Sequence, residues 1–301
     1  MMQTTNHVLM VRPVRFAFNE QTAKNNVFQQ RSGDAEATAK EAVREFDGFV
    51  ALLRENGVTV TVLQDTPEPP TPDSIFPNNC FSVHGDTLVL YPMFAPNRRL
   101  ERDKLLKVIE TGKFKRVLHL YDLEEFGSAL EGTGSMVLDR VHRIAYACLS
   151  PRTRYNTLKL WAEEMDYSYF AFHSCDEQGT PVYHTNVVMH VGSRQAVVCL
   201  ESIRDRAERE ALKARLESDG KEVVPISLAQ MHQFAGNMLE LYNDHGEQLL
   251  IMSQTARNSL TTAQVAALSK YTRILSPDIH TIETVGGGSA RCMMAELSPL
   301  S

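Results

Sequence analysis

Residues 186–226 read NVVMHVGSRQAVVCLESIRDRAEREALKARLESDGKEVVPI and contain one complete structural unit. A polar turn at Asn186 opens a strand that runs to Val191, and a second strand over 196–200 pairs with it as a hairpin. Residues 203–218 then have the length and apolar spacing of a helix, and residues 222–226 form a third strand. The stretch therefore predicts a ββαβ unit, which cannot bury its own apolar faces alone.

The same unit recurs through the chain at a nearly constant interval. Its polar or glycine turns lie at residues 79, 134, 186, 237 and 288, so the intervals are 55, 52, 51 and 51 residues. A fixed period of this length indicates an array of equivalent units. The last unit retains only its first strand, Met293–Leu297, and Val8–Val11 near the N-terminus lacks a partner. Pairing of these two strands would close five units into a ring, which protects the sheet edges.

We therefore predict an α/β fold with one domain over residues 1–301 and pseudo-five-fold symmetry. The predicted hairpins are 79–83 with 87–91, 134–138 with 144–148, 186–191 with 196–200, and 237–242 with 248–252. The predicted helices are 34–56, 98–110, 154–165, 203–218 and 262–271. The remaining predicted strands are 58–63, 116–120, 167–172, 222–226 and 273–275.

The composition excludes several classes of protein. With 43% hydrophobic residues, 23% charged residues and a net charge of −6, the chain has neither a basic run nor a nucleic-acid surface. Its first seven residues are polar, which argues against a secretory signal, and no apolar run is long enough to span a membrane. The five cysteines form no C-x-x-C pair and no zinc-like cluster. We expect free thiols in a cytoplasmic protein without a metal site.

The five turns are expected to converge at one end of the ring axis, here called the rim. Three glycines, Gly286–Gly288, precede Cys292, the one cysteine of this segment. The pattern suggests a thiol held where the backbone approaches a ligand closely. Glu131 and His184 fall at equivalent turns, so a thiol, an imidazole and a carboxylate would meet there. The other residues at these turns are Asp73, Asn78, Asn79, Thr133, Asn186, Gly236 and Asn237. The alternative is that Cys292 is a core residue and that the polar residues only form turns.

Four segments together resemble the guanidine-modifying superfamily of arginine deiminase, dimethylarginine dimethylaminohydrolase and the amidinotransferases. They are residues 286–293 (GGGSARCM), 131–134 (EGTG), 184–186 (HTN) and 76–79 (FPNN). The resemblance extends over essentially the whole chain and favours the citrulline-utilisation hydrolase branch. It implies a five-bladed α/β propeller of ββαβ units, the pentein fold, in agreement with the repeat count.

The resemblance also implies roles for individual residues. Cys292 would be the nucleophile that attacks the central carbon of a guanidinium or ureido group, His184 the general acid and base, and Glu131 the carboxylate beside it. No metal or organic cofactor would be required. Phe76, Asn78 and Asp73 would lie at the substrate.

Asn79 and Asn186 depart from the pattern of the deiminases, which have aspartates at both positions. Paired carboxylates suit a guanidinium cation, whereas an amide can donate to the oxygen of a neutral ureido group. The sequence therefore favours hydrolysis of citrulline to ornithine. The alternatives are an amidinotransferase, an arginine or dimethylarginine aminohydrolase, and a catalytically silent propeller that binds a small ligand or a protein.

The residues that hold the amino-acid end of the substrate are left open. Arg12, Arg140, Arg143 and Arg291 are candidates for its carboxylate, and Asp73 for its ammonium group. The expected partner is a small amino acid, and a homo-oligomer is compatible with the sequence.

Overall fold

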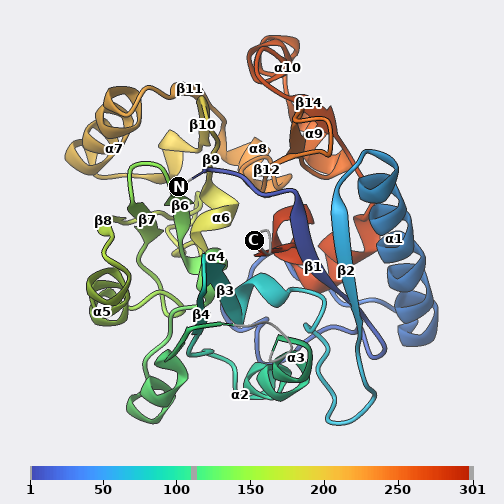
Figure 1. Cartoon of the computed structure of the whole chain (residues 1–301). Coiled ribbons are helices and arrows are strands. Elements are labelled where there is room, and N and C mark those ends of the chain that lie inside the picture. The colour runs from blue at the N-terminus through green and yellow to red at the C-terminus, as the bar shows by residue number, and fades with distance from the viewer. Residues whose placement is uncertain (1, 110–113, 298–301) are drawn as a thin grey trace.

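The computed structural model describes residues 2–109 and 114–297, and its strands form five small sheets around a common centre (Figure 1). The first sheet contains β1 (His7–Arg12), β2 (Thr59–Gln64) and β15 (Ala295–Leu297). The second contains β3 (Phe81–His84), β4 (Thr87–Leu90) and β5 (Arg116–His119). The third contains β6 (Val137–Asp139), β7 (Ile144–Cys148) and β8 (Ser168–Phe172). The fourth contains β9 (Met189–Val191), β10 (Gln195–Val198) and β11 (Glu222–Pro225), and the fifth β12 (Leu239–Tyr242), β13 (Gln248–Ile251) and β14 (Arg273–Leu275).

The predicted ββαβ unit is confirmed in its pairing pattern. In the second to fifth sheets, the first two strands pair antiparallel and the third joins parallel to the second, as in β9, β10 and β11. The predicted pairing of the two ends of the chain is also present. β15 runs antiparallel to β1, with His7 opposite Leu297, so the first sheet combines strands from both termini.

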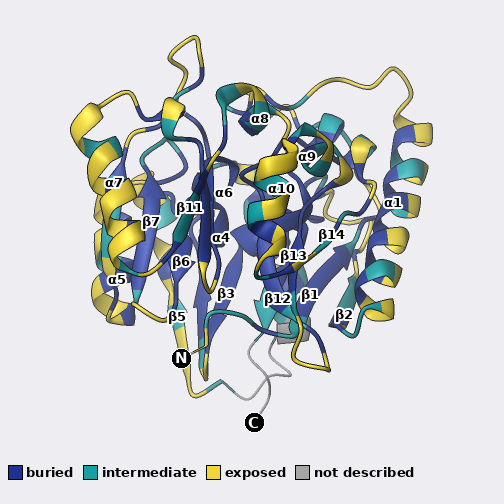
Figure 2. Ribbon diagram, turned by 90° about the horizontal axis from the view of Figure 1, so that it is seen from above, coloured by how far each residue is buried: buried dark blue, intermediate teal, exposed yellow. Residues whose placement is uncertain are grey.

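Helices cover the outside of these sheets (Figures 1 and 2). They are α1 (Ala35–Glu55), α2 (Pro96–Arg99), α3 (Glu101–Ile109), α5 (Tyr155–Met165), α7 (Arg206–Ser218), α8 (Leu228–His232), α9 (Gln254–Ser259) and α10 (Thr262–Ser269). α1 begins where the Asp34 side chain accepts a hydrogen bond from the Ala37 amide at 3.0 Å. Its inward face buries Phe46 and Phe49 against Val8 and Met10 of β1. Figure 2 shows the exposed faces of the helices outside and the buried strands inside.

Two groups of predicted boundaries were wrong. The helix predicted over 98–110 starts earlier, at Pro96, and is interrupted at Leu100; Glu110 lies outside the described residues. Proline is favoured in a first helical turn, which accounts for the earlier start. The helices α8 and α9 were not predicted.

The rim segments predicted as the first residues of strands are mostly single helical turns instead. These turns are Pro77–Asn79, α4 (Gly132–Ser135), α6 (Thr185–Val188) and Ala290–Met293. The chain turns here because neighbouring rim segments crowd each other and leave no room for an extended strand. A Cβ atom on Gly132 would collide with the carbonyl oxygen of Asn78, and one on Gly236 with that of Val187.

Contacts of this kind run from each rim segment to the next. Thr185 Oγ1 donates to the Ser135 carbonyl, which joins the rim segments of the fourth and third sheets. Asn237 Nδ2 donates to the Asn186 carbonyl at 3.0 Å, which joins the rim segments of the fifth and fourth sheets. Where the rim segments of the first and second sheets meet, the ring of Phe76 lies 2.8 Å from the place that a Cβ on Gly286 would occupy.

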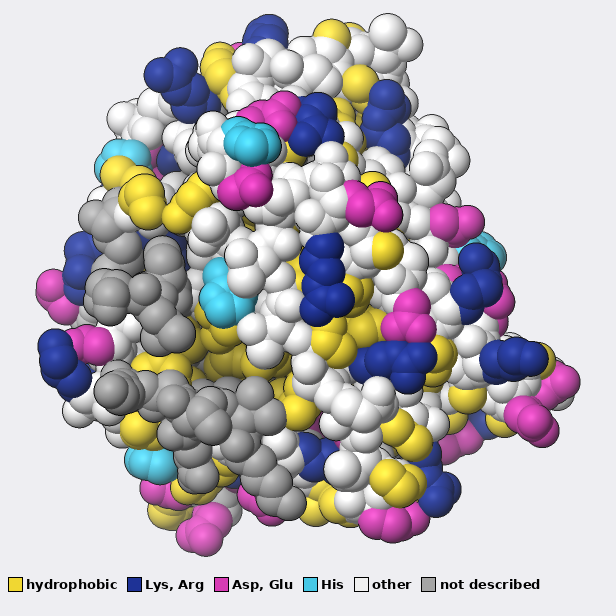
Figure 3. Space-filling view, turned by 45° about the vertical axis from the view of Figure 1, so that its right-hand side comes forward, with side chains coloured by type: hydrophobic (Ala, Val, Ile, Leu, Met, Phe, Trp, Pro, Cys, Tyr) yellow, Lys and Arg dark blue, Asp and Glu magenta, His cyan; other side chains and the backbone are white. Residues whose placement is uncertain are grey.

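The surface carries mixed charge. On the face in Figure 3, lysine and arginine side chains alternate with aspartate and glutamate side chains, without a broad patch of one sign. In the described ranges, no helix has both the length and the apolar character needed to cross a membrane.

The rim packing leads to a stability prediction. Gly236→Ala should lower the free energy of unfolding by about 1–3 kcal/mol, because backbone must move to admit the methyl group. Gly48→Ala is the matched control, since a Cβ there meets nothing within 4 Å and alanine favours the helix α1. Urea unfolding measures both variants, and equal stability of Gly236→Ala and Gly48→Ala would contradict the close packing.

Candidate active site

The thiol of Cys292 lies at the rim, 3% exposed, on the helical turn that follows the three glycines. Two side-chain amides donate to its sulfur: Asn237 Nδ2 at 3.3 Å and Asn186 Nδ2 at 3.4 Å. The side-chain oxygen of Asn237, Oδ1, accepts a hydrogen bond from the backbone N–H of Arg291 at 2.9 Å. The loop that carries Cys292 is thus tied to the preceding unit directly beside the sulfur.

His184 and Glu131 form a buried pair in the same region. Each precedes a one-turn helix, and His184 Nε2 lies 2.7 Å from Glu131 Oε2. The other oxygen of Glu131 accepts the Phe94 amide at 3.0 Å, and Arg152 lies 3.6 Å from the carboxylate. Ser135 fixes the turn by accepting the Glu131 amide and donating to the Arg152 carbonyl, both at 2.8 Å.

These contacts set the charge states of the pair. Burial opposes ionisation of Glu131, but Arg152 and His184 outweigh it and lower its pKa to about 2. Burial lowers the pKa of His184 to about 4, although Glu131 acts in the opposite direction. At neutral pH the carboxylate is ionised and the imidazole is neutral. Nε2–H therefore donates to Glu131, and Nδ1 is left as the basic nitrogen.

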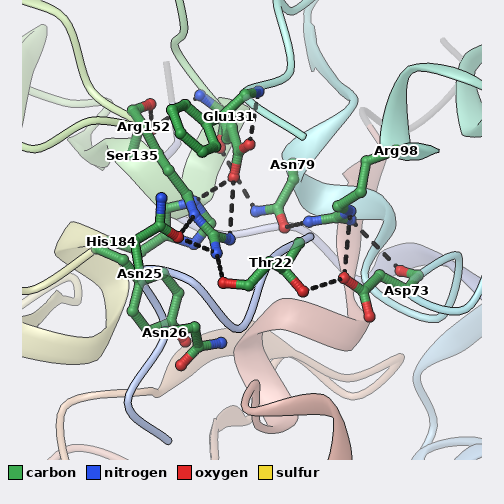
Figure 4. Close-up of polar contacts among 12 residues, drawn as sticks. Thr22, Asn25, Asn26, Asp73, Asn79, Arg98, Glu131, Ser135, Arg152 and His184 are labelled. Atoms are coloured by element: carbon green, nitrogen blue, oxygen red, sulfur yellow. Dashed lines mark hydrogen bonds and ion pairs between the residues drawn. The ribbon is translucent and has the colours of Figure 1, made fainter. Parts of the chain in front are cut away.

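A buried arginine, Arg98, contacts the polar residues on the other side of Asn79 from Glu131 and His184 (Figure 4). Arg98 donates to Asn79 Oδ1 at 2.7 Å and pairs with Glu101 at 2.8 Å, while Asp73 lies 3.9 Å away. The same Asp73 oxygen, Oδ2, accepts hydrogen bonds from Asn19 at 2.8 Å and Thr22 at 3.1 Å. Asp73 Oδ1 is buried and has no partner among the described residues.

One cavity joins these groups and encloses about 260 Å³ of space, part of it open to solvent. It is lined by Thr22, Asn26, Asp73, Phe76, Asn79, Arg98, Arg152, Tyr183, His184, Gly286, Gly287, Gly288 and Cys292. Residues Thr22 and Asn26 belong to the segment between β1 and α1, and Asn26 donates to the Gly287 carbonyl at 3.1 Å. The N-terminal segment therefore forms one wall of the cavity.

The structure brings most of the predicted site residues together. Cys292, His184, Asn79, Asp73 and Phe76 line the cavity, with Glu131 directly behind His184. Asn186 is not among the lining residues: it lines a different cavity and contacts this one only by donating to the Cys292 sulfur. The Asn78 amide instead donates to Thr133 Oγ1 at 3.3 Å, and Asn78 is not among the lining residues.

The four candidate arginines lie elsewhere. Arg12 pairs with Asp47 at 2.7 Å on the surface, and Arg143 stacks over Tyr167. Arg140 and Arg291 both pair with Glu296, at 3.3 and 2.7 Å, and line a different cavity. The cations that line the cavity beside Cys292 are Arg98 and Arg152, which the sequence analysis missed because neither is adjacent to a rim turn.

A metal site is not part of this arrangement. Among the described residues, the group with metal-ligand spacing is Asp139, His142 and Asp219. Lys221 pairs with Asp139 at 3.1 Å, and none of the three lines the cavity beside Cys292.

Comparison with known proteins identifies the family. A family model described as N,N dimethylarginine dimethylhydrolase, eukaryotic, matches residues 12–298. The chain belongs to this family. The predictions of superfamily, of fold and of a hydrolase acting on carbon–nitrogen bonds are thereby confirmed, whereas the citrulline-utilisation branch stays a prediction. No curated protein matches the chain.

Solved structures of similar fold include bacterial arginine dihydrolases. The N-terminal domain of the cyanobacterial arginine dihydrolase ArgZ, a cysteine-to-serine mutant bound to substrate, has a TM-score of 0.78 and 17% identity over 97% of this chain and 98% of that one. Apo ArgZ has a TM-score of 0.77 and 16% identity over 97% of this chain, which spans 40% of its length. A dimethylarginine dimethylaminohydrolase adduct with S-methyl-L-thiocitrulline has a TM-score of 0.67 and 13% identity, covering 99% and 100% of the two chains.

The lowered pKa of His184 leads to a prediction about acid stability. The unfolded chain protonates this histidine near its ordinary value of 6.5, whereas the folded protein resists protonation down to about 4. The free energy of unfolding should therefore fall as the pH drops from 6.5 to 4, by on the order of 3 kcal/mol from this residue. His184→Gln should remove that part of the fall, because glutamine does not titrate. Its amide can still donate to Glu131, so the buried carboxylate keeps a partner.

Chemical denaturation at several pH values measures this effect. His245→Gln, at a histidine whose side chain is 84% exposed, is the control and should follow the parent. Burial also lowers the pKa of His84 and His190, so some slope should remain in all variants. Curves for His184→Gln and the parent that stay parallel over this range would be inconsistent with a buried neutral His184.

Proposed function

We propose that the protein is a cysteine hydrolase that cleaves a carbon–nitrogen bond of a ureido or guanidino amino acid through a covalent adduct on Cys292. The observation that carries the proposal is one cavity lined by both Cys292 and a neutral His184, which an ionised Glu131 holds from behind, while two side-chain amides donate to the Cys292 sulfur. The sulfur supplies the nucleophile and His184 a group that can accept and return a proton.

The steps follow from these charge states. The sulfur of Cys292 attacks the central carbon of the substrate, and the thiol proton passes to His184. The imidazolium is stabilised by Glu131 and protonates the departing ornithine amine as its bond to carbon breaks. His184, neutral again, takes a proton from water as the water attacks the thioester-like adduct, and it returns that proton to the departing sulfur to restore the Cys292 thiol. From citrulline and one water, the products are ornithine and carbamic acid, which decomposes to ammonia and carbon dioxide.

The orientation of Asn79 supports a ureido substrate. Arg98 can only donate hydrogen bonds, so its contact with Asn79 Oδ1 fixes the amide with Nδ2 on the other side. Nδ2 lies 3.5 Å from the Glu131 carbonyl and beside His184, where it can donate to a substrate oxygen. A ureido group offers that oxygen and a guanidinium does not. We therefore assign citrulline as the preferred substrate.

A guanidinium substrate is the second candidate, and the negative charge of the site favours it. Glu131 is ionised next to the reacting position, and Asp73 Oδ1 is a buried acceptor with no described partner. The family description names dimethylarginine and the similar ArgZ structures are arginine dihydrolases, so arginine and methylated arginine belong in any substrate test.

Asn79→Asp separates the two candidates. The substitution replaces an N–H donor by a charged acceptor, so kcat/KM for citrulline should fall by roughly ten- to a hundredfold, whereas arginine should bind more tightly. Ornithine and ammonia release, measured without an added amine, gives kcat/KM for both and distinguishes hydrolysis from group transfer. Asn78→Asp, a neighbouring change outside the cavity lining, is the control.

An unchanged ratio of the two kcat/KM values in Asn79→Asp would remove the substrate assignment and leave the thiol mechanism in place. We use Asn79 alone because Asn186 also contacts the sulfur, and its substitution would alter nucleophile and substrate contacts together.

A further inference from the structure

Asn237 differs from Asn186, the other donor to the Cys292 sulfur, because its side-chain amide is held in one orientation. Its oxygen accepts the backbone N–H of Arg291 at 2.9 Å, and a backbone N–H can only donate. Its nitrogen must therefore lie on the opposite side, where it donates to the Asn186 carbonyl at 3.0 Å and to Cys292 Sγ at 3.3 Å. Asn186 has no such second anchor, since its Oδ1 is buried without a partner among the described residues.

The other buried cysteines show how unusual this environment is. The sulfur of Cys80 lies 3.2 Å from a carboxylate oxygen of Glu101. That of Cys148 lies 3.6 Å from the Val182 carbonyl and 3.5 Å from Thr185 Oγ1, whose hydroxyl also donates to the Ser135 carbonyl. Burial raises the pKa of both thiols. Within the described residues, Cys292 instead faces two N–H donors, which interact more strongly with a thiolate than with a thiol.

In the resting site, His184 does not stabilise negative charge on the Cys292 sulfur. Its described hydrogen bond is to Glu131, and as a neutral imidazole it brings no positive charge to the sulfur. The remaining charged or titratable groups that line the cavity with Cys292 are Asp73, Arg98, Arg152 and Tyr183. Arg291 is the residue before Cys292 in the chain, and Glu131 lies behind His184. Arg98 and Arg152 are paired with carboxylates, and Arg291 is paired with Glu296.

We infer that Asn237 is a catalytic residue whose fixed amide N–H stabilises negative charge on the Cys292 sulfur as the thiol ionises. The inference rests on the proposed role of Cys292 as the nucleophile. Asn186 contributes a second donor. His184 accepts the thiol proton as the sulfur attacks and passes it to the departing amine, so stabilisation of the charge on sulfur and proton transfer to the substrate belong to different residues.

The test is the pH dependence of Cys292 alkylation by iodoacetamide, with the modified peptide identified by mass spectrometry. Asn237→Leu removes the donor without adding charge. It should raise the midpoint of the alkylation profile by about one pH unit or more, which is roughly a tenfold lower rate near neutral pH. Asn78→Leu is the matched control, because Asn78 is a buried rim asparagine whose amide contacts Thr133 and not the sulfur. His184→Gln should leave the midpoint near that of the parent.

A folded Asn237→Leu variant with the parental midpoint would overturn the inference, as would a larger shift in His184→Gln than in Asn237→Leu. If Asn237→Leu does not fold, Asn237→Ala decides, because it also removes the donor without adding charge and has a smaller side chain. A raised midpoint in Asn237→Ala then supports the inference, and an unchanged one overturns it. Alkylation needs no substrate, so this result is independent of whether citrulline or arginine is turned over.

Discussion

The close approach of neighbouring rim segments is the constraint on which the rest of the structure depends. Where Gly132 meets Asn78 and Gly236 meets Val187, the backbones touch and no side chain fits between them. This packing forces the chain into short helical turns in place of the ends of strands. It also brings side chains from residues more than 150 positions apart in the sequence, such as Asn79 and Cys292, to one cavity. The site is therefore a consequence of how the units pack, and not of any single unit.

The second requirement is that the buried charges stay paired. Arg98 lies between Glu101 and Asp73, and Glu131 lies between His184 and Arg152, all of them almost fully buried. An unpaired charge at such depth would cost several kcal/mol, so each charge depends on its partner. The pairing also has a chemical consequence. It keeps Glu131 ionised and His184 neutral, which leaves one basic nitrogen for proton transfer.

The sequence predicted the repeat because periodicity is a property of the chain itself. The unit boundaries, the strand pairs and the union of β1 with β15 follow from turn spacing and apolar runs, as does the gathering of Glu131, His184 and Cys292. Local helical turns at the rim were not predicted, because they result from crowding between units. Arg98 and Arg152 were missed for a related reason: burial and pairing select them among many arginines, and spacing does not reveal either property.

The central claim is that the reaction passes through a covalent adduct on Cys292, and acid-quenched turnover followed by intact-protein mass spectrometry tests it most directly. With citrulline the protein should gain the mass of one carbamoyl group, and with arginine that of one amidino group. Peptide mapping should locate either on Cys292, and Cys292→Ser should carry neither and lose turnover. Adduct-free protein during steady turnover, or full activity in Cys292→Ser, would contradict the account.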